Sequence, residues 1–180
     1  QRSSPWIGLS DLTRRCLLLQ EEGALFPQEH LPNLAQMGQE TETSLALWTV
    51  SPSDLADVLL LEIVRARPHA VYFGTHAARG TLAEALEQLV AHCPSIRRIC
   101  CIAELPTDTT ATTTNAWALL DWLTHHQRAL RLAHQALATT PELGEALRPY
   151  HPDVQVIESA MCKNLDATNA INIARVNHSG

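Results

Sequence analysis

The sequence has no excess of positive charge, and this absence excludes some classes of partner. It contains 13 lysine and arginine residues against 19 aspartate and glutamate residues, which gives a net charge of −6 at pH 7. Proteins that bind nucleic acids or anionic membranes usually present a basic surface. We therefore expect no nucleic-acid partner, and we attribute the acidic balance mainly to solubility.

Long apolar runs are also missing. The longest uninterrupted runs, 99–103 and 116–120, are far shorter than the roughly 20 residues that a membrane span needs. The first residues, 1–5, have neither the basic head nor the apolar core of a signal peptide. We therefore expect no transmembrane segment and a cytoplasmic location. The lack of an initiator methionine indicates a fragment or a processed product.

The five cysteines and nine histidines follow no metal-binding spacing. No C-x-x-C or H-x-x-x-H sequence occurs, and Cys100 and Cys101 would point to opposite faces of a strand. The chain also lacks the glycine-rich motifs of P-loop ATPases and dinucleotide-binding proteins, and the G-x-S-x-G motif of α/β-hydrolases. We therefore expect buried thiols in a reducing compartment, and no cofactor.

What the sequence does contain is an alternation of two hydrophobic periodicities. Short apolar runs predict strands at 16–19, 44–50, 69–73, 99–103, 135–139 and 154–157. Amphipathic patterns between them predict helices at 55–67, 81–92, 115–134 and 140–148. This alternation is typical of βαβ units with right-handed crossovers, and it predicts one α/β domain over 1–180 with a largely parallel sheet. Within 1–44 it predicts only the strand at 16–19.

Two helix starts have recognisable caps. Ser51 to Asp54 supplies a hydroxyl cap and an acidic first turn for the helix at 55–67. Thr140, Pro141 and Glu142 supply a hydroxyl cap, a proline at the first helical position and an acid in the first turn.

Three segments carry a resemblance to a known family. Residues 67–72 read R-P-H-A-V-Y, residues 102–106 read I-A-E-L-P, and residues 133–148 read A-H-Q-A-L-A-T-T-P-E-L-G-E-A-L-R before P-D-V-Q-V-I at 152–157. In this order they resemble the N-terminal domain of GT-B-type glycosyltransferases related to family 4. The turn I-P-N of that family is replaced by Glu158-Ser159-Ala160, and its H-x-H is reduced to Thr75-His76.

The resemblance implies a Rossmann-like three-layer domain that forms one half of a GT-B architecture. It implies that the chain binds the acceptor, a glycan or another hydroxyl compound. The nucleotide-sugar donor would be bound by a second domain that this chain lacks, so the fragment alone would be inactive. Residues 163–180 would then begin the linker to that domain.

Candidate site residues follow the predicted strands. His76 follows the strand at 69–73, and its ordinary pKa of about 6.5 suits a base that accepts a proton from an acceptor hydroxyl. Glu104 follows the strand at 99–103, and Asp108 comes shortly after it; their carboxylates could bind acceptor hydroxyls. Because parallel strands present their carboxyl ends at one edge, His76, Glu104 and Thr139 should gather there. The alternative for His76 and Glu104 is an ordinary surface turn.

Three further residues are candidates for substrate binding. Thr139 and Thr140 would expose hydroxyls beside a helix N-terminus, although Thr140 could be a plain helix cap. Gly23 could let a ligand approach the backbone, or could simply form a turn. The pair His125-His126 lies in a polar stretch of the helix at 115–134, and we interpret it as surface.

A rival function belongs to another class. The chain could be a non-catalytic flavodoxin-like or receiver-like binding module. A phosphoacceptor version is disfavoured because no aspartate stands at the end of a central predicted strand.

Overall fold

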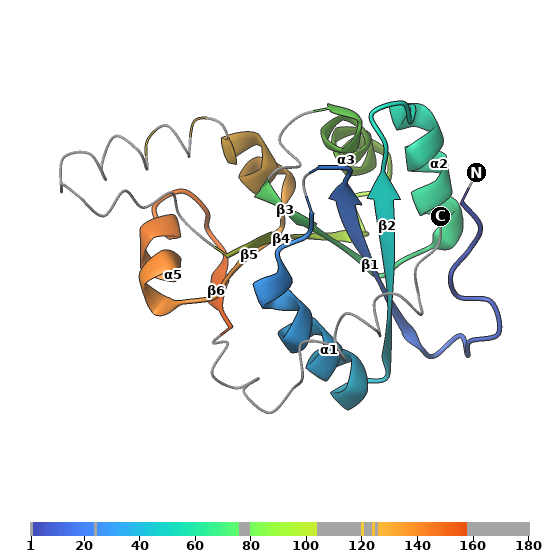
Figure 1. The fold of residues 1–180 in the computed structure, drawn as a ribbon, viewed down its shortest axis with the longest axis horizontal. Helices are drawn as coiled ribbons and strands as arrows, with labels where there is room; N and C mark the ends of the chain where they lie inside the picture. The colour runs from blue at the N-terminus through green and yellow to red at the C-terminus, as the bar shows by residue number, and fades with distance from the viewer. Residues whose placement is uncertain are drawn as a thin grey trace.

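The computed structural model describes residues 2–23, 25–75, 80–103, 120, 124 and 126–157 (Figure 1). Its centre is a six-stranded sheet in which every adjacent pair of strands is parallel, and the strand order is β2-β1-β3-β4-β5-β6. The strands are β1 (Arg14–Glu21), β2 (Thr43–Val50), β3 (Ala70–Gly74), β4 (Arg97–Ile102), β5 (Gln135–Ala138) and β6 (Val154–Val156). The α/β class and the parallel sheet are thus confirmed.

The strands form where the apolar runs predicted them, because strands covered on both faces need apolar side chains at successive positions. Strand β1 extends two residues beyond the predicted run at each end and lies inside the sheet between β2 and β3. Cys100 and Cys101 show the two-sided burial directly, since each is fully buried in a different one of the two hydrophobic clusters. Cys16, Cys100 and Cys101 are buried free thiols, as expected, whereas the free thiol Cys93 is only half-buried and Cys162 lies outside the described residues.

Helices cover the two faces of the sheet unequally. One face packs against α2 (Ala56–Ala66), α3 (Gly80–His92), a helical segment at 126–132 and α5 (Pro141–Leu147). The other face packs against α1 (Leu31–Glu40), which follows a 3₁₀ turn, η1 (Gln28–His30). In Figure 1, α1 lies across the sheet from α2 and α3. No other described helix shares the side of α1, so over β4, β5 and β6 this face lacks a described helical cover.

The helix α1 was not predicted. Its sequence, L-P-N-L-A-Q-M-G-Q-E, contains few apolar residues, and only Leu34 and Ala35 are buried. Pro32 in its first turn supports a helix start, but no side chain caps that start. A helix with so narrow an apolar stripe is stabilised by its packing on the sheet more than by its own pattern.

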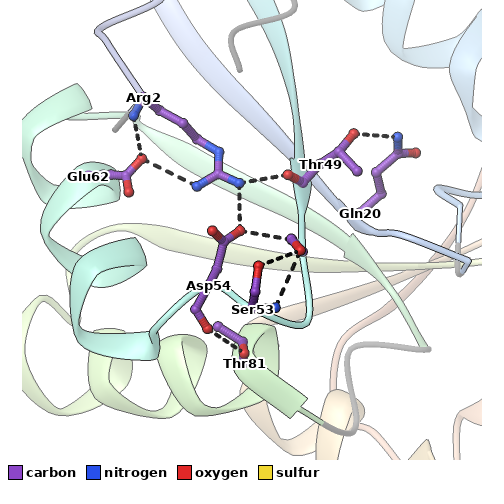
Figure 2. Close-up of polar contacts among 8 residues, drawn as sticks. Arg2, Gln20, Thr49, Ser53, Asp54, Glu62 and Thr81 are labelled. Atoms are coloured by element: carbon purple, nitrogen blue, oxygen red, sulfur yellow. Dashed lines mark hydrogen bonds and ion pairs between the residues drawn. The ribbon is translucent and has the colours of Figure 1, made fainter.

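The predicted hydroxyl cap of α2 is wrong. The helix begins at Ala56 with Leu55 as its uncapped N-cap residue. The Asp54 carboxylate instead accepts hydrogen bonds from the Ser51 backbone N–H (2.8 Å) and from the Arg2 guanidinium (2.9 Å) (Figure 2). The Ser51 and Ser53 hydroxyls bond to each other at 2.9 Å, so neither caps the helix. The carboxylate expected in the first turn of the helix is bound instead by the distant Arg2.

Arg2 ties the start of the chain to the edge of the sheet (Figure 2). Its guanidinium donates to the Thr49 carbonyl oxygen at 2.6 Å and lies 3.3 Å from the Glu62 carboxylate. Its backbone N–H donates to the same carboxylate at 2.9 Å, and its guanidinium carbon lies 5.7 Å from the centroid of the Trp48 ring. Glu62 is only 6% exposed, so these contacts compensate a buried negative charge.

Some predicted segments lie outside the described residues. Of the helix predicted at 115–134, only residues 120, 124 and 126–134 are described, and they are helical at 120, at 124 and over 126–132. The linker predicted at 163–180 is likewise outside. None of the described helices is both long enough and apolar enough to cross a membrane.

Candidate functional site

The strand order places a candidate site at the carboxyl edge of the sheet. After β1 the chain moves to β2 on one side, and after β2 it crosses to β3 on the other side of β1. In open α/β sheets, ligands bind outside the carboxyl ends of the strands at such a reversal. The residues that follow the strands at this edge include 22–23 after β1, Thr75 after β3, Ala103 after β4 and Thr139 after β5.

Part of this edge is covered by the connection from β1 to α1. Phe26 is 4% exposed, and its backbone N–H donates to the Gln20 side chain at 3.0 Å. Pro27 packs on the end of β3, where a Cβ added to Gly74 would lie 3.2 Å from the proline Cδ. The glycine thus allows the connection to sit directly against β3.

His30 is the most unusual side chain at this edge, and sequence reasoning missed it. It is 1% exposed, and its Nε2 lies 2.9 Å from the Ile102 carbonyl oxygen at the end of β4. A carbonyl can only accept, so Nε2 carries the proton and Nδ1 keeps a bare lone pair. That Nδ1 is buried and has no hydrogen-bond partner among the described residues. Burial lowers the pKa of His30, which favours this neutral form.

A carboxylate stands at the start of α3. Glu21 ends β1, and a Cβ added to Gly80 would lie 3.5 Å from its Oε1. Gly80 has φ of +74°, a left-handed conformation that glycine adopts without steric cost. Negative charge beside a helix N-terminus is favourable because the first N–H groups point toward it. The Thr81 hydroxyl anchors the same turn by donating to the Asp54 carbonyl oxygen at 2.9 Å.

His76, Glu104 and Asp108 lie outside the described residues, but the residues just before the first two are described. The His126 ring Nδ1 lies 2.8 Å from the carbonyl oxygen of Thr75, the residue before His76. The Thr139 hydroxyl donates to the carbonyl oxygen of Ala103, the residue before Glu104, at 3.1 Å. The side chains of His126 and Thr139 therefore hold the backbone directly before His76 and Glu104.

Thr139 and His126 differ from what the sequence predicted. We expected an exposed Thr139 hydroxyl, but the residue is 6% exposed and its hydroxyl bonds to Ala103. We also expected His126 on the surface, but it is half-buried and bonds to Thr75. Each bond links strand ends or elements far apart in sequence, and local patterns carry no signal for such partners.

Thr140 and Gly23 have the simpler of their two expected structures. The Thr140 side chain accepts from the Leu143 backbone N–H at 3.2 Å and caps α5, as the Thr-Pro-Glu sequence predicted. Gly23 is exposed with φ of +79° and has no atom within 4 Å of an added Cβ, so it forms an open turn after β1.

No group of three or more His, Cys, Asp or Glu side chains that could hold a metal ion occurs among the residues that the structure describes. The sequence matches no protein-family model, and no curated protein is significantly similar to it.

Proposed function

We propose that this protein is the acceptor-binding domain of a glycosyltransferase and that the acceptor binds at the carboxyl edge of β3, β4 and β5. The observation that carries the proposal is the pair of contacts that hold this edge, from His126 to Thr75 and from Thr139 to Ala103. These three strands are neighbours, so Thr75 and Ala103, the residues before His76 and Glu104, lie at adjacent strand ends. The capped turn at 139–141 also folds in the order that the family resemblance implied.

In this function His76 is the base and a second domain, not in this chain, holds the nucleotide-sugar donor. The acceptor hydroxyl gives its proton to the His76 imidazole while its oxygen bonds to the anomeric carbon of the sugar. The bond from that carbon to the nucleotide phosphate oxygen breaks, and the nucleotide leaves with the electron pair. The Glu104 and Asp108 carboxylates would accept hydrogen bonds from other acceptor hydroxyls.

Saturation-transfer NMR of the full 180-residue chain with a panel of mono- and disaccharides tests the binding step. At least one sugar should bind, and His76→Ala should weaken that sugar several-fold. His92→Ala is the matched control, because His92 is an exposed histidine in the last turn of α3. In the two-domain protein, His76→Ala should also lower turnover with little change in unfolding midpoint. Undiminished sugar transfer by folded His76→Ala protein would remove His76 as the base.

A second candidate is a non-catalytic binding module. The order β2-β1-β3-β4-β5 within the sheet is the flavodoxin-like order, which favours this alternative. The same NMR experiment with sugars, together with the gene sequence beyond residue 180, distinguishes the two candidates. Sugar binding, together with a second βαβ domain encoded after residue 180, favours the transferase. The absence of binding to any sugar, together with a stop codon after residue 180, favours the non-catalytic binding module.

A further inference from the structure

A groove beside α1 has the features of a second binding site. It runs over the sheet face that α1 covers only in part, and its volume of about 410 Å³ falls within the range of roughly 300–1,000 Å³ typical of ligand pockets. Among the described residues its apolar floor is formed by Cys16, Leu34, Met37, Tyr72, Ile99 and Leu137. This α1 groove lies along the face of the sheet and reaches His30 at one end, whereas the acceptor site proposed above lies at the carboxyl edge of β3, β4 and β5.

Two arginine side chains line the end of this groove that lies at the amino edge of the sheet, opposite the carboxyl edge discussed above. Arg14 opens β1 and Arg97 opens β4, and both line the groove with exposed side chains. They share a sheet face, because each lies two residues before a buried floor residue, Cys16 or Ile99. Only β3 separates their strands, so the two backbones lie about 10 Å apart. Long arginine side chains on such strands can reach a common anion.

The charges of this pair are not neutralised by ion pairing with the described part of the chain. No described side chain forms an ion pair or a hydrogen bond with either guanidinium group. Glu40, at the end of α1, also lines the groove; its carboxylate accepts a hydrogen bond from Gln36 at 2.8 Å and keeps its charge, so two cations stand against one anion there. The amino end of the groove therefore carries more positive than negative charge.

Tyr72 connects the cations to the apolar floor. It lies on β3, between the strands of Arg14 and Arg97, and is largely buried. Burial raises the pKa of its phenol well above the usual range, while the charges of Arg97 and Arg14 act in the opposite direction. Both guanidinium groups are thus within electrostatic reach of this hydroxyl. Its described partners are two weakly interacting sulfur atoms, that of Met37 at 3.8 Å and that of the Cys16 thiol.

We propose that the α1 groove binds a small amphipathic carboxylate. The apolar chain or ring of the ligand lies on the floor, and its carboxylate meets Arg14 and Arg97. Guanidinium groups match the geometry of a carboxylate, and such charge-assisted hydrogen bonds are stronger than neutral ones. The apolar part contributes affinity in proportion to the surface that it removes from water.

Calorimetric titration of the full chain with octanoate, 1-octanol and acetate tests this site. Octanoate should bind about tenfold or more tightly than octanol, which lacks the charge, and than acetate, which lacks the chain. The double variant Arg14→Gln/Arg97→Gln should reduce octanoate to the affinity of octanol and leave octanol unchanged. Both residues are exposed, so the variant should fold, and its unfolding midpoint checks this.

Arg65→Gln is the matched control, since Arg65 is an exposed arginine in the last turn of α2, across the sheet. It should leave octanoate affinity unchanged. Three results would overturn the proposal: no octanoate binding at millimolar concentration, equal affinity for octanoate and octanol, or the same loss from Arg65→Gln. The first is also the result expected if residues 158–180 of the chain itself fill the groove.

Discussion

Arg2 serves three acceptors at once, and one of them is a buried acid. Replacing Arg2 by Ala should leave the Glu62 carboxylate buried without its cation, because the Arg2 backbone N–H would be its remaining partner among the described residues. We expect a loss of about 2–4 kcal/mol in the free energy of unfolding, measured by urea denaturation. Arg148→Ala, which breaks the exposed pair with Glu145, should cost less than about 1 kcal/mol.

A double-mutant cycle sharpens this prediction. In a Glu62→Gln background the side chain no longer carries a buried charge, so Arg2→Ala should cost clearly less there than in the native sequence. Equal losses in both backgrounds would mean that Arg2 acts through Thr49, Asp54 and Trp48 rather than through Glu62.

Two histidines at the amino edge make stability depend on pH in a defined direction. His69 Nδ1 accepts the Arg15 N–H at 3.0 Å, and His134 Nδ1 accepts the Arg98 N–H at 3.1 Å. For both rings, partial burial and then neighbouring arginines lower the pKa in the folded protein. Below pH of about 6.5 the unfolded chain therefore takes up protons first, and stability falls as the pH drops toward the folded-state values.

Urea denaturation at pH 7.5 and pH 5.5 measures this effect. The variant His69→Asn/His134→Asn keeps a side-chain acceptor at each position but cannot titrate. It should be less sensitive to acid than the native protein, while His92→Asn should leave the pH dependence unchanged. The sensitivity should not vanish, because the lowered pKa of His30 acts in the same direction.

At the scale of the element, α5 depends on a close approach to β6. A Cβ at Gly144 would overlap the Val156 Cγ2 atom, although Gly144 lies in the helix interior. Helix propensity alone predicts that Gly144→Ala stabilises by about 1 kcal/mol. We expect the opposite sign, a destabilisation of about 1–3 kcal/mol from overpacking, measured as a change in the denaturation midpoint. Adding Val156→Ala should recover part of the loss, and failure to do so would show that the contact is not limiting.

Sequence patterns predicted elements well where burial is two-sided. The runs in β1, β2, β3 and β4 are apolar because both faces of the strand are covered, so composition alone reveals them. The helix α1 was missed because only one narrow stripe contacts the sheet. The cap of α2 was wrong because the Ser51 and Ser53 hydroxyls bond to each other. The acid expected in its first turn, Asp54, bonds to Arg2, and no local pattern encodes a partner that far away.

The candidate site was less predictable than the fold for the same physical reason. Its edge followed from strand order, but the roles of Thr139, His126 and His30 depend on hydrogen bonds between distant segments. No sequence pattern around His30 marks it as buried, because its burial results from the path of the connection between β1 and α1.

At the scale of the whole molecule, the proposal that separate domains bind acceptor and donor predicts that this chain does not bind nucleotide sugars tightly. The described residues form one parallel sheet, and in the proposed function the nucleotide-sugar pocket belongs to another domain. Calorimetry of this chain with UDP- and GDP-sugars should therefore give no low-micromolar binding. A dissociation constant in that range would mean that the chain is the donor-binding half. Titration with the mono- and disaccharides used above provides the comparison.

The bond from Arg2 to Thr49 also affects how the molecule behaves among its own copies. Strand β2 is an eight-residue edge strand, and the Val50 carbonyl accepts from Glu22 on the side of β1. Carbonyls alternate along a strand, so the Thr49 carbonyl faces the open side, where a second molecule could pair. Arg2 occupies that acceptor and places a bulky cation beside the edge. Through this contact Arg2 should hinder a second molecule from pairing with the β2 edge, and so should reduce edge-to-edge aggregation.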